Sequence, residues 1–281
     1  MEQRLFYIIS ILATLIFSAC EEVINIDIDQ APAQLVIDGL ITNEDTTHTL
    51  RITRSVAFND NSSEVVADAV VEVSDNLGNV FNYTHNPEGY DSLMGYYFSD
   101  QKFSGQEYAI YRLNVMVDNQ SFTASDTLRP ITTIDSLSIK IDDDAVNDSE
   151  NEGKIYQVIL YAKEPQETVD FYYFKFYRDG ILDNDSDNSG NVYVFDDKVL
   201  GSSLDGLPSP VLFREGEVAG VEIYSLTREQ FVYFTDLGNI LNSDGGMFSP
   251  PPANPRSNIS GGALGLFQVS GLNRASILIT P

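Results

Sequence analysis

The chain has 281 residues, 42 of them acidic and 16 basic, which gives a formal net charge of −26. A balance this acidic repels phosphate backbones and excludes nucleic-acid binding as a function. The length accommodates one large or two ordinary domains.

The first twenty residues have the three parts of a lipoprotein signal peptide. A short polar start contains Arg4, an apolar run covers residues 5–17, and Ser18-Ala19 precede Cys20. The apolar run is shorter than the ~20 residues that a membrane-spanning helix needs. Small residues let a peptidase reach the backbone, and the cysteine sulfur can carry lipid. We therefore predict removal of residues 1–19 and lipidation of Cys20; the alternative is an ordinary secretory signal followed by a chance cysteine.

Cys20 is the only cysteine, so an exported form of this chain has no internal disulfide. Several acyl chains on this residue would make a stable membrane anchor, with residues 20–34 as the lipidated N-terminus and tether. Glu21 and Glu22 follow directly and resemble the surface-export signal of Bacteroidota-type lipoproteins. That resemblance implies an outer-membrane location facing the cell exterior; the alternative is the periplasmic face.

Residues 35–130 contain short strand patterns separated by turn residues. The segment Ala69–Thr84 is typical of a β-hairpin, with Gly78 in its turn. Further strand patterns cover residues 25–29, 35–41, 48–55, 95–98, 107–115 and 120–124. Such spacing predicts a β-sandwich of immunoglobulin or transthyretin-like type.

Residues 131–281 are expected to form a second, β-rich domain with one packed helix. Pro130 marks the boundary, and the acidic stretch 142–152 is expected to be a loop. Strand patterns cover residues 158–162, 171–177, 192–195, 217–224 and 276–280. Thr227 with Gln230 has capping-box spacing, and Leu226 with Phe231 has hydrophobic-staple spacing, so a helix should begin there.

Glycines near the C-terminus mark a place where the backbone must turn or pack closely. These are Gly261, Gly262 and Gly265. We expect these glycines to have a purely structural role in a tight final hairpin that closes the second domain; the alternative is direct contact with a ligand or receptor.

Several segments together resemble a family of Bacteroidota outer-membrane lipoproteins whose shared domain has unknown function. The segments that carry the resemblance are Cys20 with its two glutamates, 35–42, 69–73 with Gly78, 105–108, the helix from Leu226, and 258–267. Members are often encoded beside TonB-dependent receptors. The resemblance therefore implies an accessory role in uptake.

Motifs for catalysis are missing from the sequence. It contains no zinc-binding cysteine pair, no nucleophile elbow and no phosphate loop, and its two histidines, His48 and His85, are expected to be polar turn residues. A Ser–His–Asp site is not excluded by spacing, because triad order varies between folds. No cofactor is expected apart from one weak candidate for structural Ca²⁺.

That candidate is the loop containing Asp183, Asp185 and Asp187, whose alternate carboxylates could bind one hard cation. It departs from the EF-hand pattern, and the alternative is a flexible polar hairpin tip.

The expected function is a non-enzymatic cell-surface lipoprotein, an accessory binding partner of a TonB-dependent outer-membrane uptake system. Its membrane contact would be the lipid anchor. Two alternatives stay open. One is a surface hydrolase with a glycosidase-like carboxylate pair, and the other is an adhesion or envelope-structure module.

Overall fold

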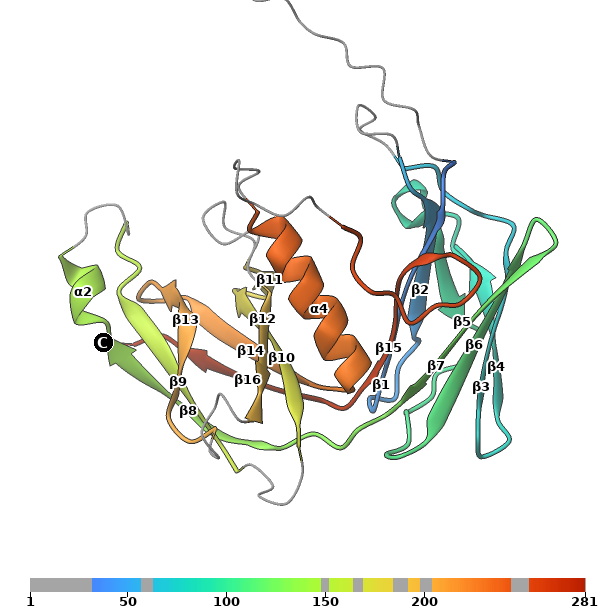
Figure 1. The fold of residues 1–281 in the computed structure, drawn as a ribbon. Coiled ribbons are helices and arrows are strands. Elements are labelled where there is room, and N and C mark those ends of the chain that lie inside the picture. Colours follow the sequence, from blue (N-terminus) through green and yellow to red (C-terminus); the bar gives the residue numbers. More distant parts are fainter. Residues whose placement is uncertain are drawn as a thin grey trace, which may run out of the picture. The chain divides into compact units, whose positions relative to one another are not determined.

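The computed structural model describes residues 32–56, 63–147, 152–163, 169–183, 192–197, 204–243 and 253–280. Residues 33–281 form one compact unit (Figure 1). The expected signal peptide, nearly all of the tether and the strand expected at 25–29 lie outside the described residues.

An eight-stranded sheet contains the N-terminal strands in the order β15-β1-β2-β5-β4-β3-β6-β7. Its members are β1 (Leu35–Thr42), β2 (Thr49–Arg54), β3 (Val70–Asp75), β4 (Val80–His85), β5 (Tyr96–Ser99), β6 (Ile110–Val117), β7 (Gln120–Thr127) and β15 (Leu264–Ser270). The 3-10 helix η1 (Asp91–Leu93) lies before β5. The hairpin predicted around Gly78 is confirmed as β3 and β4, which pair antiparallel.

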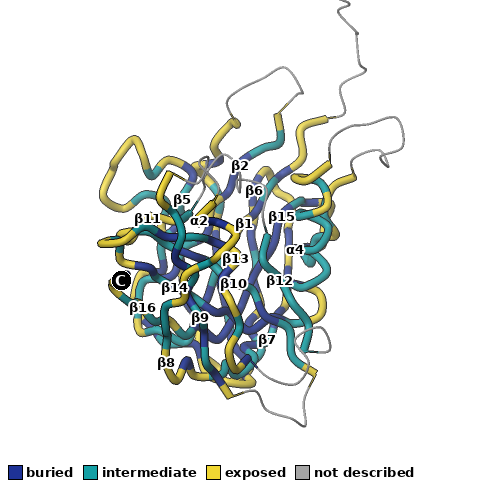
Figure 2. The backbone as a smooth tube through the Cα atoms, turned by 90° about the vertical axis from the view of Figure 1, so that its left-hand side faces the viewer, coloured by how far each residue is buried: buried dark blue, intermediate teal, exposed yellow. Residues whose placement is uncertain are grey.

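The two edge strands of this sheet, β7 and β15, approach each other. Arg129, just after β7, forms a parallel bridge with Ser270. Before β15, Ser260 donates its backbone N–H to the carbonyl of Thr123 at 2.8 Å. The sheet therefore folds around its own core, where side chains such as Ile37, Val115 and Phe267 are fully buried. Figure 2 shows buried residues along these strands and exposed ones in the turns.

The second part is a sandwich of two smaller sheets. The five-stranded sheet comprises β10 (Phe171–Arg178), β11 (Ile181–Leu182), β12 (Tyr193–Asp196), β14 (Val218–Leu226) and β16 (Leu272–Leu278). The three-stranded sheet comprises β8 (Ile134–Ile141), β9 (Tyr156–Ala162) and β13 (Leu207–Phe213). Alternate residues of these strands, among them Val158, Phe174 and Val221, form the second core.

Helix α4 (Arg228–Leu241) covers the other face of the five-stranded sheet. Its residues Phe231, Phe234 and Leu237 join a third apolar cluster that includes Leu226 of β14 and Leu266 of β15. The predicted capping box is present, since the Thr227 and Gln230 side chains each bond the other's backbone N–H. No helix within the described residues has the length and apolarity needed to cross a bilayer.

The mainly β fold with one packed helix is confirmed, but three details differ from expectation. First, β15 comes from the C-terminal segment and pairs parallel with β1, so position 130 does not separate the two sheet systems along the chain. The glycine segment therefore leads into a strand of the first sheet instead of a closing hairpin.

The other two differences concern short elements. The acidic stretch expected to be a loop begins with a short helix, α2 (Asp143–Val146), whose N-cap Asp142 accepts backbone hydrogen bonds from Asp144 and Ala145, both at 3.0 Å. Strand β13 carries Pro208 and Pro210 and was not expected. It is an edge strand with a register shift between Pro208 and Leu212, where missing N–H donors are tolerated.

Candidate functional site

The predicted lipidation and calcium residues lie mostly outside the described residues. This applies to Cys20, Asp185 and Asp187. Asp183 is described, and its side chain is only 2% exposed and forms an ion pair with Arg178. The described residues contain no group of three or more His, Cys, Asp or Glu arranged to hold a metal ion. The calcium loop stays a prediction, and lowering of the melting temperature by a chelator, reversed by calcium, would test it.

Neither histidine is a free turn residue. His48 is 3% exposed, and its Nε2 donates to the carbonyl of Phe103 at 2.9 Å. Burial lowers the pKa of this imidazole, which keeps it neutral. Nε2 of His85 accepts the backbone N–H of Gly95 at 3.0 Å. Both rings thus stabilise local structure around β2, β4 and β5.

A different set of charged residues meets where the first sheet, the five-stranded sheet and α4 come together. Asp38 lies on β1, Lys175 on β10 and Glu222 on β14, and each is the single charge facing outward from an otherwise apolar or aromatic stretch of strand. Strand alternation explains their common direction, because β1 and β10 turn their other face into the two cores. We call Asp38, Lys175, Glu222, Tyr173, Tyr224 and Tyr233 the Asp38–Lys175 cluster.

Glu222 is the satisfied member of this cluster. Its Oε2 accepts hydrogen bonds from the hydroxyls of Tyr177 and Tyr224, both at 2.7 Å. Its Oε1 lies 3.6 Å from the guanidinium of Arg274, which also pairs with Glu44 at 2.6 Å. The negative charge of Glu222 is therefore balanced within the protein.

Lys175 and Asp38 are not balanced in this way. The Lys175 ammonium lies over the rings of Tyr224 and Tyr173, 4.9 and 5.5 Å from their centroids. Within the described residues it forms no ion pair, although its cross-strand neighbour is Glu222. Asp38 has dense surroundings but keeps a solvent-exposed surface, and it likewise has no hydrogen bond or ion pair with any described residue.

The titration behaviour of these groups reflects their dense surroundings. Burial raises the pKa of the Asp38 carboxyl, an effect that Lys175 and Arg51 partly offset. Burial lowers the pKa of Lys175, while Glu222 and Asp38 oppose this shift. Burial, with Asp38 nearby, raises the pKa of Tyr173 and of Tyr233 to about 12, so both hydroxyls stay protonated at neutral pH. The cluster therefore offers one carboxylate, one ammonium and two phenol hydroxyls.

Sequence reasoning missed this cluster although a signal was present. A single charged residue in the middle of a buried-strand pattern, as in Phe171–Arg178 or Leu35–Thr42, needs a partner or a ligand. The local pattern could not predict the strand pairing that brings these residues together.

A second polar centre is fully internal. Asp126 of β7 is 6% exposed, and its carboxylate accepts hydrogen bonds from the Val269 N–H at 2.8 Å, the Thr227 hydroxyl at 3.2 Å and the Gln230 amide. Burial raises the pKa of Asp126 to about 7, against the opposing effect of these bonds. This carboxyl joins β7, β15 and the start of α4.

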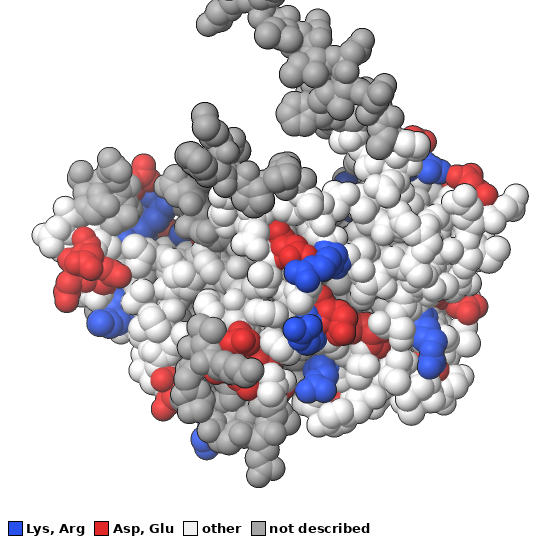
Figure 3. Space-filling model, viewed as in Figure 1, with Lys and Arg blue, Asp and Glu red and all other residues white. Residues whose placement is uncertain are grey.

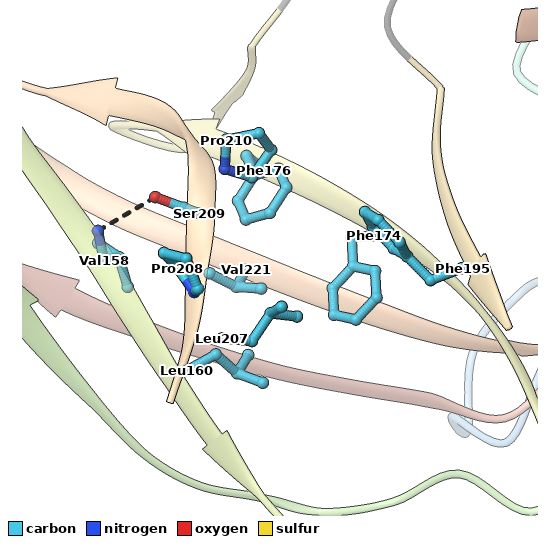
Figure 4. Close-up of a pocket in the computed structure, with 10 residues that line it drawn as sticks. All are labelled: Val158, Leu160, Phe174, Phe176, Phe195, Leu207, Pro208, Ser209, Pro210 and Val221. Atoms are coloured by element: carbon cyan, nitrogen blue, oxygen red, sulfur yellow. Dashed lines mark hydrogen bonds between the residues drawn. The ribbon is translucent and has the colours of Figure 1, made fainter. Parts of the chain in front are cut away.

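Two hollows lined by described residues lie elsewhere. One of about 490 Å³ adjoins the start of α4 and includes the charged residues Arg129, Arg228 and Glu229. The other, of about 20 Å³, lies inside the second sandwich, where Phe174, Phe176 and Phe195 surround it (Figure 4). Ser209 at its rim accepts the Val158 N–H at 3.1 Å and donates to the Val211 carbonyl at 2.7 Å. The second hollow is a small apolar packing gap, because no polar group points into it unpaired.

The face that carries α4 shows basic side chains lying beside acidic ones (Figure 3). Among the ion pairs of the described residues, the guanidinium of Arg256 lies 2.6 Å from the carboxylate of Asp236 on α4. Local pairing of this kind leaves no extended basic surface on the visible face, which agrees with the strongly negative composition.

Comparison with known proteins gives a family but no activity. The family model described as Domain of unknown function (DUF4249) matches residues 21–274. A search of curated proteins returned no match.

Proposed function

Because the chain belongs to the DUF4249 family, whose description gives no activity, we propose its function from the residues: a non-enzymatic cell-surface lipoprotein that binds the substrate of an outer-membrane uptake receptor. In this proposal Cys20 carries the lipid, and a TonB-dependent receptor is the partner. The sequence features and the family resemblance support the anchor and the partner.

The observation that carries the binding role is the Asp38–Lys175 cluster. Asp38, Lys175 and the hydroxyls of Tyr173 and Tyr233 have no hydrogen-bond or ion-pair partner among the described residues, while Glu222 beside them is fully paired. A polar group that has no hydrogen-bond or ion-pair partner gains more binding free energy from a ligand than a group that is already paired. The two histidines, the usual general bases near neutral pH, are tied to backbone groups away from this cluster.

The proposal is tested by purifying the native lipoprotein from gently solubilised membranes and identifying what accompanies it. We expect an outer-membrane receptor to copurify, and deletion of the protein to impair uptake of one nutrient class. A Cys20→Ser variant is the control for anchoring, since it should no longer fractionate with membranes as a processed chain.

Two results would contradict the proposal. The first is recovery of no receptor with the native protein. The second is turnover of a glycan or peptide substrate that a single acidic substitution abolishes without unfolding the protein.

A further inference from the structure

We propose that one end of the eight-stranded sheet, the end at which β1 begins, docks on the surface of a bilayer of zwitterionic lipid. Six exposed apolar side chains mark this end, and we call them the tether-end rim: Val56, Val65, Val70, Tyr90, Met94 and Met116. The proposal rests on the lipid anchor at Cys20 that the proposed function contains, and it adds which surface of the folded unit faces the membrane.

The strand order brings these side chains to the same end of the sheet. From β1 to β7 every neighbouring pair of strands is antiparallel, so the starts of β1, β5, β3 and β7 lie beside the ends of β2, β4 and β6. In Figure 1 the start of β1 lies at the top of this sheet, and the β3–β4 turn lies at its bottom. Ala33, the first residue of the compact unit, therefore lies at the same end as the rim.

Register and contacts place the rim residues beside one another in small groups. Val70 and Met116 are cross-strand partners at the start of β3 and near the end of β6. Val65 lies against Gly95, since a Cβ built on Gly95 would be 3.3 Å from Cγ1 of Val65. Met94 directly precedes this glycine. The rim is therefore formed by neighbouring loops and strand ends that are held by the sheet.

The other two rim residues are joined to the same end by hydrogen bonds. The side chain of Asn86 accepts the N–H of Tyr90 at 3.0 Å and donates to its carbonyl at 2.8 Å. Val56 follows Ser55, whose N–H donates to the carbonyl of Gln34 at 2.8 Å. Val56 therefore lies next to the point at which the chain enters the compact unit.

The length of the tether favours this end of the sheet over the opposite one. The twelve residues 21–32 separate Cys20 from Ala33 and span at most about 43 Å. Strand β1 has eight residues and is about 27 Å long. The β3–β4 turn could therefore meet the bilayer only if the tether ran along the whole sheet. The tether also gives the rim an effective concentration of about millimolar at the lipid surface, so weak apolar contacts are sufficient for docking.

The charge at this end determines which lipid it can meet. Exposed carboxylates surround the rim, namely those of Glu64, Asp68, Glu88, Asp91 and Asp118. The guanidinium of Arg54 already pairs with Glu64 and Asp118. Anionic headgroups would be repelled by this end, whereas zwitterionic headgroups would not.

The test uses the fact that the sequence contains no tryptophan, so one substitution introduces a single fluorophore. The rim reporter is Val70→Trp, and the matched control is Leu77→Trp in the β3–β4 turn, because these side chains are 67% and 61% exposed. Each full-length lipoprotein is reconstituted through its own lipid into phosphatidylcholine vesicles with and without brominated acyl chains. We expect brominated lipid to reduce the emission of the Val70→Trp protein by about half or more, because apolar groups at the interface reach the acyl boundary. The emission of the Leu77→Trp protein should not change.

Charge substitutions then test the rim itself. Met94→Asp together with Met116→Asp, made in the Val70→Trp protein, should abolish the quenching. Leu77→Asp together with Val80→Asp in the same protein is the matched control and should leave the quenching intact. All four side chains are exposed, so neither pair of changes should unfold the sheet. Replacing part of the phosphatidylcholine with phosphatidylglycerol should weaken the quenching at low salt, and added salt should restore it.

Four results would overturn the inference: no quenching of either reporter, equal quenching of both, quenching that survives the rim aspartates, or quenching that phosphatidylglycerol does not weaken. In each case the protein still floats with the vesicles, so the anchor in the proposed function stands. A protein that does not float with the vesicles and carries no lipid on Cys20 would contradict the anchor and this inference together.

Discussion

Gly265 and Gly78 share nearly the same backbone conformation, with φ angles of +98° and +97°, but their surroundings are opposite. A Cβ on Gly265 would lie 2.0 Å from the carbonyl oxygen of Ile37, whereas a Cβ on Gly78 would meet nothing within 4 Å. The close approach at Gly265 exists because β15 pairs there with β1. The sequence predicted close packing or a turn at Gly265, and the structure shows close packing against β1.

Substitution of these two glycines separates strain from crowding. Gly78→Ala should cost about 1–2 kcal/mol, the price of positive φ in a residue with a Cβ. Gly265→Ala should cost about 1–3 kcal/mol more, because the neighbouring atom is backbone that cannot move without breaking the strand pairing. Urea unfolding of both variants measures the difference; equal losses would contradict the contact between β15 and β1.

Asp126 leads to a prediction about pH. Its pKa of about 7 in the folded protein lies above the ordinary value of 3.8, so the folded state holds the proton more tightly than the unfolded state. The stabilisation is therefore fully present below pH 3.8 and is lost as the pH rises through 7. Relative to Asp126→Asn, the wild-type free energy of unfolding should fall by about 2–3 kcal/mol between pH 5 and 8.

The Asn variant serves as the reference because it lacks this titration, while the chain's many other carboxyls titrate equally in both proteins. A flat difference over that range would mean that the hydrogen bonds from Val269, Thr227 and Gln230 outweigh the effect of burial.

At the scale of elements, the sequence predicted the structures that depend on neighbouring residues and missed those that depend on distant strand pairing or are very short. The α4 start and the β3–β4 hairpin were predicted because a cap, a staple and a turn glycine each act within a few residues. Strand β13 was missed because prolines normally argue against a strand, and its edge position, which tolerates them, depends on pairing with distant β9. Helix α2 was missed because four residues leave no periodic pattern.

The α4 cap can be weighed by a pair of threonine substitutions. Thr227→Ala removes the cap and also a hydrogen bond to Asp126, and it should cost about 1–2 kcal/mol. Thr235→Ala makes the same chemical change inside the helix, where the hydroxyl only bonds back to the Phe231 carbonyl at 2.7 Å. It should be neutral or slightly stabilising, because alanine is the better helix former. Thermal unfolding measures the stability of both variants. Equal losses would show that the Thr227 cap does not stabilise the helix more than an interior threonine does.

At the scale of the whole molecule, a strand from the C-terminal part of the chain pairs with the first described strand. After the second sandwich is built, β15 adds to β1 in parallel and β16 then pairs with β14. Position 130 was predicted as a boundary from a local proline and a change in pattern. A local signal cannot show that a strand more than 200 residues from β1 will lie beside it (Figure 1). The same limit hid the Asp38–Lys175 cluster, whose members come from β1, β10, β14 and α4, elements that lie far apart in the sequence.

This topology gives a prediction for fragments. Residues 33–130 expressed alone lack β15, so the β1 edge is unpaired, and core residues Val269 and Phe267 are missing. We expect this fragment to be unfolded or aggregated, because a long unpaired edge beside a core gap is both unstable and prone to association.

A second fragment joins residues 33–130 to residues 257–271 through twelve flexible Gly/Ser residues, which span roughly 19 Å on average.

The second fragment restores the pairing and the core, so it should show a cooperative melting transition and dispersed amide resonances where the first shows neither. Its remaining weakness is Leu266, which normally contacts the apolar cluster at α4, and a Leu266→Thr change in the linked fragment should improve its solubility without unfolding it. If residues 33–130 alone melt cooperatively, then β15 is an addition to a complete domain. In that case the boundary at 130 is a true domain boundary, and β15 docks on a sheet that is stable without it.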